Sequence, residues 1–450
     1  MKKGYINLIR LVVFLSIPST YLSANDPFAE MEAAFENSSF EESSSKNSSR
    51  STSGEPAMSE FEKFKQQELN DFESYKKKLM EEFAEFKQIS QKETRAFQNK
   101  LSKQWDKPEL SSRKVWVEYS KDLKEKKSVD FEKQLISISQ TTDNGARSDK
   151  KLRTSLKQLI TKNKAEAFKD DALAQAIEKK SKQKISLLKT AKVKPTPILI
   201  PHISGEQTLS DKEIDDIVDR MIKQSKKKES INKQGKKVVT VELPMDVIDK
   251  KLSEKEQVSE TKKPKVMADL RVNKLPRQAR MIQDDVIKFA GKSKVENSLV
   301  FAIIETESAF NPMARSPVPA YGLMQIVPTS AGQDATQQLF GKAKILSPSY
   351  LYSSDRNIEV GTTYLNILFY RYLKGIKNEE SRLYCTIAAY NTGAGNVAKA
   401  FTGKRRLKSA LAKINALSPD DVYEHLINNL PYDETRKYLA KVTKRIPKYQ

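Results

Sequence analysis

Residues 297–326 read NSLVFAIIETESAFNPMARSPVPAYGLMQI, and this stretch decides the fold of the C-terminal half. Leu299, Ile303 and Glu307 recur at intervals of four, so their side chains share one face of a predicted helix. The Asn-Pro pair at 311–312 ends that helix, because a residue before proline avoids the α region. Glu307 therefore lies on an apolar face near a helix C-terminus, where desolvation and the helix dipole both predict a raised pKa.

The sequence around this stretch predicts more helices. Beyond about residue 267 the helical patterns are at 277–290, 297–308, 328–339, 356–373, 382–391, 419–428 and 433–444. Only the segment 314–326 looks irregular or β-like. We therefore expect an all-α domain over 269–450, preceded by a charged linker over 256–268.

The N-terminal half has a different pattern. An aromatic repeat with a period of eleven residues starts at Phe61 and predicts a long amphipathic helix over 58–105. The repeat places the aromatic side chains in one stripe along the helix. This stripe would pack on its own protein, on a second copy or on a membrane surface. Residues 106–255 mix short strand patterns with basic helices and predict a small α/β domain. The fold class is therefore α+β.

The first residues predict export. Basic residues precede an apolar run at 11–22 and small residues follow it, which is the order of a secretory signal over 1–24. An uncleaved anchor is the alternative. Residues 25–57 are Ser-rich and predict a flexible linker. The single cysteine, Cys385, is far from the cleavage point, so we expect a periplasmic protein, with membrane association left open but without a lipoprotein cysteine.

Charge and composition limit the kinds of binding partner and cofactor that the sequence predicts. Lys and Arg number 80 against 58 Asp and Glu, and this net charge of +22 favours an anionic partner such as a membrane surface or a cell-wall polymer. Export argues against nucleic acid. With one cysteine, and with His202 and His425 far apart, neither a metal nor another cofactor is predicted. The sequence does not reveal the oligomeric state.

Several residues after Glu307 could bind a sugar. Tyr390 offers a ring and a hydroxyl group, and Gln325 and Asn391 each provide a donor and an acceptor. Gly322 would let the backbone approach a ligand closely. These side chains would complete a site around the predicted acid.

The order of these motifs resembles the soluble-lytic-transglycosylase domain of the goose-lysozyme-like superfamily. The matching strings are Glu307-Ser308-x-Phe310-Asn311-Pro312, Ser316, Gly322-Leu323-Met324-Gln325, Ala389-Tyr390-Asn391 and Glu434-Thr435-x-x-Tyr438. The strings Trp116-Val117-Glu118-Tyr119-Ser120 and Val129-Asp130-Phe131-Glu132 also resemble the N-terminal domain of a membrane-bound branch of that family.

The resemblance implies a lysozyme-like α fold and a lyase that cuts peptidoglycan glycan strands, with Glu307 as the sole catalytic acid and base. Such enzymes cleave between N-acetylmuramic acid and N-acetylglucosamine without water and leave a 1,6-anhydromuramoyl end. The implied substrate-binding residues are Ser308, Ser316, Gly322, Met324, Gln325, Tyr390, Asn391, Glu434 and Tyr438.

Three readings of the function remain open at this stage. Hydrolysis usually needs two carboxylates about 5–10 Å apart, and no second acid accompanies Glu307 in its motif, which favours the lyase. Asp334 and Glu434 are the candidates for a second acid in a muramidase. A non-catalytic peptidoglycan-binding protein is the third reading.

Overall fold

The computed structural model describes residues 60–142, 149–246 and 275–450. The predicted signal, Ser-rich linker and charged linker lie outside these residues. None of the helices in the three described segments combines the length and the apolar character that a membrane crossing requires.

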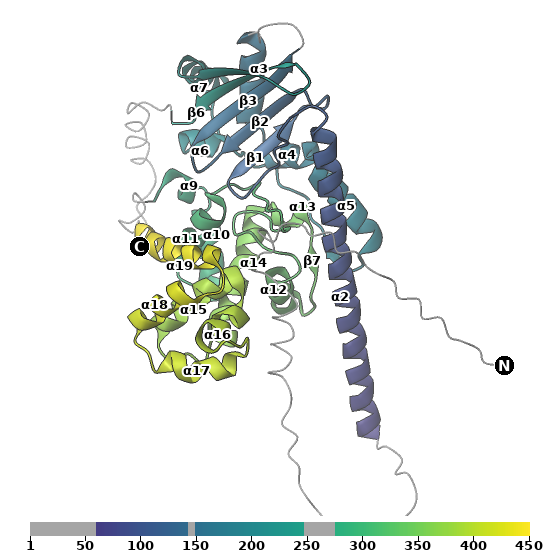
Figure 1. The fold of residues 1–450 in the computed structure, drawn as a ribbon, viewed down its shortest axis with the longest axis vertical. Helices are drawn as coiled ribbons and strands as arrows, with labels where there is room; N and C mark the ends of the chain where they lie inside the picture. The colour runs from purple at the N-terminus through teal and green to yellow at the C-terminus, as the bar shows by residue number, and fades with distance from the viewer. Residues whose placement is uncertain (1–59, 143–148, 247–274) are drawn as a thin grey trace, which may run out of the picture.

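The N-terminal part is built on a five-stranded antiparallel sheet in the order β1-β2-β3-β6-β5 (Figure 1). Alternate residues of β6 are buried, and Leu243 and Val241 lie opposite the buried Ile136 and Ile138 of β3, as expected for an apolar packed face. The strands are β1 (Val115–Tyr119), β2 (Glu125–Asp130), β3 (Leu135–Thr142), β5 (Lys226–Ile231) and β6 (Lys237–Pro244).

Five helices accompany this sheet, and α7 packs against both α3 and β6. They are α3 (Asp149–Thr161), α4 (Lys164–Asp170), α5 (Ala172–Lys184), α6 (Ile200–Ser204) and α7 (Asp211–Lys223). The predicted mixture of strands and helices is therefore present. The sequence did not predict β5, whose residues KKKESI are all exposed. As an edge strand without a buried face, β5 has no alternation to reveal it.

The predicted long helix is α2 (Glu60–Leu101), which runs beside α5 (Figure 1). Its stripe packs on its own protein where the side chains are described, with Phe83 and Phe86 buried. Glu82 also accepts hydrogen bonds from the Ser186 hydroxyl and the Leu187 N–H. Of the three surfaces considered for this stripe, its own protein is the one that these contacts support.

The C-terminal part is helical, as predicted, apart from one short strand. β7 (Ile345–Leu346) pairs in parallel with β4 (Leu188–Lys189) of the N-terminal part. The helices are α9 (Arg277–Arg280), α10 (Gln283–Ser293), α11 (Asn297–Ser308), α12 (Ala331–Phe340), α13 (Pro348–Leu351), α14 (Ser354–Asn366), α15 (Glu379–Thr392), α16 (Ala394–Thr402), α17 (Leu407–Asn415), α18 (Pro419–Asn429) and α19 (Asp433–Arg445), with a π-helix at Ile367–Tyr372 and a 3-10 turn at Ile446–Tyr449.

Some predicted helix boundaries were wrong. The helix predicted over 277–290 is interrupted between α9 and α10, and the one predicted over 356–373 changes into the π-helix after α14. The sequence missed α16 and α17. Residues 314–326 form the expected irregular segment, in which Tyr321 bridges to Arg315 and Ile326.

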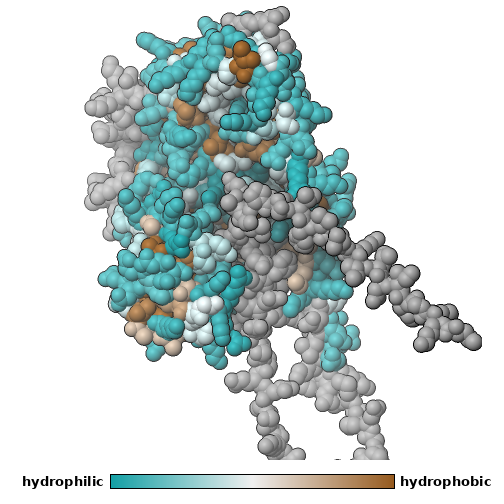
Figure 2. All heavy atoms as spheres, in the orientation of Figure 1, coloured by the Kyte–Doolittle hydropathy of each residue, from teal (hydrophilic) through white to brown (hydrophobic). Residues whose placement is uncertain are grey.

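Polar contacts join the two parts. Arg315, which is buried, lies 3.4 Å from Asp171, and the Lys164 amine donates to the Ser354 hydroxyl at 2.9 Å. Burial lowers the pKa of Lys164 to about 8. These specific pairs bind the N-terminal part to the helical part. Hydrophilic residues dominate the outer face that Figure 2 shows, with few apolar residues among them.

Candidate active site

Glu307 is buried at the C-terminal end of α11, where its exposed fraction is 5%. Nearly every residue of α11 is buried, so the helix forms the centre of the C-terminal core. The chain then turns sharply, because Ala309 and Phe310 both have positive φ angles, of 50° and 64°. This geometry fixes the carboxyl group at the point where the buried helix meets the irregular segment.

The environment of Glu307 changes its proton affinity in the predicted direction. Burial raises the pKa of Glu307 from 4.5 to about 7, and the charge of Glu434 acts in the same direction. Arg113 and the Tyr438 hydroxyl lower this pKa. Desolvation is the largest of these effects, so the carboxyl group is half protonated near neutral pH.

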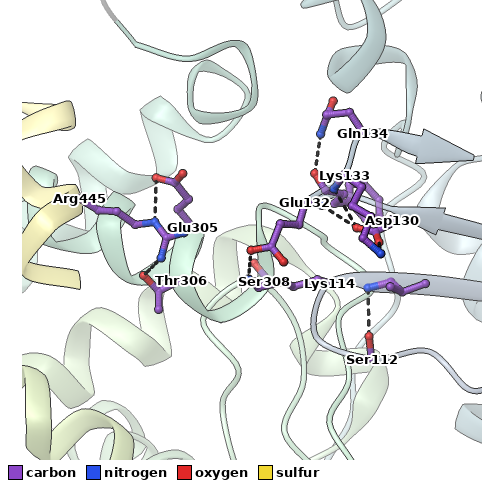
Figure 3. Close-up of polar contacts among 12 residues, drawn as sticks. Ser112, Lys114, Asp130, Glu132, Lys133, Gln134, Glu305, Thr306, Ser308 and Arg445 are labelled. Carbon is purple, nitrogen blue, oxygen red and sulfur yellow. Dashed lines mark hydrogen bonds and ion pairs between the residues drawn. The ribbon is translucent and has the colours of Figure 1, made fainter. Parts of the chain in front are cut away.

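Glu305 occupies the other side of the helix. Its carboxylate accepts hydrogen bonds from Lys448 at 2.9 Å and Tyr449 at 2.6 Å. Arg445 lies between Glu305 and Thr306 (Figure 3). These contacts lower the pKa of Glu305, against the effect of its burial. Two acids in the same helix therefore have opposite tendencies to ionise.

An arginine that the sequence analysis missed lies beside Glu307. Arg113 belongs to the segment before β1, and its Nη1 atom is 3.7 Å from Glu307 Oε2. Its Nη2 atom is 2.8 Å from Oε1 of Glu434, a half-exposed residue of α19. No periodicity or motif marks this residue, and it is far from Glu307 in the sequence.

Tyr390 and Tyr438 are brought to the same acid from two different helices. The Tyr390 hydroxyl, on α15, donates to the Met324 carbonyl at 2.8 Å. The charge of Glu307 contributes to the raised pKa of both tyrosines, after burial. Among the described residues the buried Tyr438 hydroxyl on α19 has no hydrogen-bond partner of normal geometry, but it lies close enough to Glu307 to lower the pKa of that acid. Asn391 accepts from the Thr435 hydroxyl at 2.8 Å and so joins α15 to α19.

Gly322 has a positive φ of 76°, and protein atoms crowd the position where a Cβ atom would be. A Cβ atom there would lie 2.3 Å from Asn357 Nδ2 and 2.4 Å from the Leu351 carbonyl. Asn357 donates to the Tyr321 and Leu351 carbonyls and accepts from the Met324 N–H. Glycine is therefore required for packing around Asn357, which the sequence analysis did not single out, and the predicted contact with a ligand stays a prediction.

The remaining predicted residues differ in whether their side chains keep a polar atom free to bind a ligand. Gln325 donates to the Gly322 carbonyl at 3.0 Å, while its Oε1 atom is buried without a hydrogen-bond partner among the described residues. The Met324 side chain packs under the site, against Gly361. Ser308 is fully buried and donates to the Ile304 carbonyl at 3.0 Å, and Ser316 donates to the Val318 carbonyl. Gln325 thus keeps a free acceptor.

Neither of the two candidate second acids is free. Asp334 is partly buried and accepts from the Tyr372 hydroxyl at 2.9 Å, and desolvation raises its pKa. Glu434 is held by Arg113. Within the described segments, no group of three or more His, Cys, Asp or Glu residues could hold a metal ion.

Known proteins match this part of the chain. Residues 285–412 match the Transglycosylase SLT domain family. The family resemblance of the sequence motifs is thus confirmed for this segment, which includes Glu307, Gln325 and Tyr390.

Two curated relatives are named membrane-bound lytic murein transglycosylase C. The protein from Yersinia pestis (strain Pestoides F) is 43% identical over 178 residues, and the one from Serratia proteamaculans (strain 568) is 44% identical over 178 residues. Each match covers 40% of this chain and 49% of the relative. The chain thus spans about half the length of the curated relatives it matches.

Two solved structures are also similar. The lytic transglycosylase Slt from Pseudomonas aeruginosa, solved as an inactive mutant, is 29% identical with a TM-score of 0.30, and the match covers 38% of this chain and 24% of that one. The 70-kDa soluble lytic transglycosylase SLT70 from Escherichia coli is 25% identical with a TM-score of 0.29, over 38% of this chain and 25% of that one.

Proposed function

We propose that this chain is a peptidoglycan lytic transglycosylase that uses Glu307 as its single acid and base. The observation that carries the proposal is the burial of Glu307, which raises the pKa of this carboxyl group to about 7 within the segment that matches the SLT family. A general acid works best when its pKa lies near the working pH. The relatives named lytic murein transglycosylases support the same class of substrate.

In the proposed reaction Glu307 acts twice. The protonated carboxyl group gives its proton to the oxygen between N-acetylmuramic acid and N-acetylglucosamine as the bond from that oxygen to C1 breaks. The carboxylate then takes the proton of the C6 hydroxyl of the same muramic acid, and the C6 oxygen bonds to C1. The product is a 1,6-anhydromuramoyl end. No water is consumed, and Glu307 returns to its protonated form.

The surroundings of Glu307 favour this lyase over a muramidase. A hydrolase of the usual kind needs a second carboxylate that is free to activate water or attack the sugar. Glu434 is occupied by Arg113, and Asp334 by Tyr372. A muramidase on the same site is the alternative, and a non-catalytic peptidoglycan-binding protein is a weaker one, because a binding site has no need for a buried acid with a raised pKa.

The proposed glycan contacts follow from the free polar groups. The Gln325 Oε1 atom is a buried acceptor without a partner and could receive an N–H or O–H group of the sugar. In this proposal α15 contributes Tyr390 and Asn391 to the glycan contacts. Helix α19 contributes Glu434 and Tyr438. Ser308, Ser316, Gly322 and Met324 support the shape of the groove in this proposal, since their contacts are with the protein itself.

We also propose a periplasmic location, on the export signal that the sequence predicts over 1–24. The net charge of +22 would favour contact with anionic wall polymers or lipid head groups. No nucleic acid, metal or other cofactor is part of this proposal.

Digestion of purified peptidoglycan followed by mass spectrometry tests the reaction. The wild-type protein should release muropeptides with anhydro ends, and Glu307→Gln should release none while still binding the glycan. Products with free reducing ends would establish the muramidase instead. Undiminished cleavage by Glu307→Gln would remove Glu307 from the mechanism, and no cleavage by either protein would leave the binding protein.

A further inference from the structure

The segment before β1 is held directly against the loop that follows the acid. The Arg315 N–H donates to the Ser112 carbonyl at 3.2 Å, and the Asn311 side chain donates to the Arg113 carbonyl at 3.3 Å. Ser112 is also tied to its own sheet, because its N–H donates to the Val115 carbonyl at 2.7 Å. The backbone of Arg113 is therefore fixed from both sides.

The side chain of Arg113 joins two acids that differ in exposure. Its guanidinium lies 3.7 Å from Glu307, whose side chain is 6% exposed, and 2.8 Å from Glu434, whose side chain is 50% exposed. The short contact with Glu434 is a charge-assisted hydrogen bond, and it orients the guanidinium toward the buried acid. The arginine side chain is 40% exposed, so it connects the buried acid with the solvent-accessible surface.

We propose that Arg113 is a positioning residue for the reaction: carried by the N-terminal part and oriented by Glu434, it stabilises the carboxylate that Glu307 becomes between its two proton transfers. This inference rests on the proposed function. A buried carboxylate is costly unless a cation or hydrogen-bond donors compensate it. The proposed reaction forms that carboxylate at every turnover, when Glu307 has given its proton to the glycosidic oxygen.

Of the other groups named around Glu307, the Tyr438 hydroxyl also lowers its pKa, but none carries a positive charge. Glu434 on α19 is an acid and raises the pKa of Glu307, and Tyr390 on α15 and Tyr438 on α19 are neutral phenols with strongly raised pKa values. Arg113 is the cation among these groups, and its charge is maintained by both glutamates. The N-terminal sheet thus provides a charge that the helical part lacks at this position.

Replacing Arg113 should leave the two parts together. The Arg315–Asp171 pair, the Lys164–Ser354 hydrogen bond and the β4–β7 pairing do not involve its side chain. The backbone hydrogen bonds of Ser112 and Arg113 also remain in any side-chain variant. The variant therefore tests the guanidinium and not the docking of the parts.

The test compares Arg113→Met and Arg113→Lys with the control Arg153→Met. Arg153 suits as a control because it also joins two carboxylates, Asp215 and Asp219, with 37% exposure, but on α3 and α7 of the N-terminal part. The Glu307 carboxyl would be titrated by NMR of protein labelled with ¹³C at the glutamate carboxyls, with its signal assigned by its loss in Glu307→Gln. The pH profile of anhydro-product release would be measured on the same proteins.

Arg113→Met should move the titration midpoint of Glu307 upward by about one pH unit, the lower end of the effect of an opposite charge at this distance, because the arginine is partly exposed. The alkaline limb of the activity profile should move in the same direction, and kcat should fall more than KM rises. Arg113→Lys should restore part of both effects. Arg153→Met should leave the midpoint and the profile as in the wild type.

Two results would overturn the inference. The first is an unchanged Glu307 midpoint in Arg113→Met, and the second is an equal shift in Arg153→Met, which would reveal a general effect of net charge. Failure of the proposed function has a different signature: the wild-type protein would release free reducing ends or nothing, or Glu307→Gln would still release anhydro ends. The titration of Glu307 tests Arg113 in either case.

Discussion

Glu307→Gln should stabilise this protein, and the gain should depend on pH. Because the folded state raises the pKa of Glu307 from 4.5 to about 7, it binds this proton more tightly than the unfolded chain does. Between these two pH values the folded state therefore holds more protons, and its free energy of unfolding falls as pH rises. The full loss corresponds to about 3 kcal/mol, at about 1.4 kcal/mol for each pKa unit.

Glutamine does not ionise, so the variant avoids this loss. Urea unfolding of both proteins at pH 4 and pH 8 measures it: the free energy of unfolding of Glu307→Gln, relative to wild type, should rise by about 3 kcal/mol between the two pH values. A matched variant is Glu305→Gln, which should show the opposite trend because the pKa of Glu305 is lowered. If the advantage of Glu307→Gln were the same at both pH values, Glu307 would not be a desolvated acid and the proposed mechanism would lose its basis.

Three further substitutions test the architecture around the site. Gly322→Ala should destabilise the protein by about 3 kcal/mol in thermal unfolding, because of overlap with Asn357 and a positive φ, whereas Gly341→Ala, with φ 70° and open space, should cost only about 1 kcal/mol. Equal costs would refute the crowding at Gly322. Asp171→Asn keeps the cap of α5 but leaves Arg315 unpaired, and should cost about 3 kcal/mol in urea unfolding; a neutral effect would contradict this pair. Tyr390→Phe should cost about 1 kcal/mol and slow glycan cleavage, as measured by product release, and unchanged rates would place Tyr390 outside the site.

The sequence predicted α11 and the position of Glu307 well because both depend on local pattern. The apolar residues at intervals of four define one face, and the Asn-Pro pair defines the end of the helix. The raised pKa follows from the same two facts, since a side chain on an apolar face is desolvated. α18 was predicted nearly to its ends for a similar reason, because Ser418 and Pro419 mark its start.

Residues that depend on contacts between distant segments were not predictable in this way. Arg113 lies in a stretch without periodicity, and the hydrogen bonds of Ser112 with Arg315 and of Arg113 with Asn311 bring it to Glu307. Asn357 looks like an ordinary polar residue of α14, and its role is visible only once Gly322 and Leu351 surround it. The charged strand β5 carries no buried face, so its pattern could not distinguish it from the basic helices nearby.

The two halves of this chain build the irregular segment 314–326 together, which gives the N-terminal part a physical role at the site. Arg315, at the start of this segment, is buried, with its side chain beside Asp171 and its N–H donating to the Ser112 carbonyl. Without the N-terminal part, the charge of Arg315 would be either exposed to water or buried without a partner. The same docking that satisfies Arg315 places Arg113 over Glu307, so one interface both orders the segment and supplies the cation. A mutation that loosens this interface should therefore change the docking of the two parts and the proton affinity of Glu307 together, whereas Arg113→Met should change stability chiefly through the shifted pKa of Glu307.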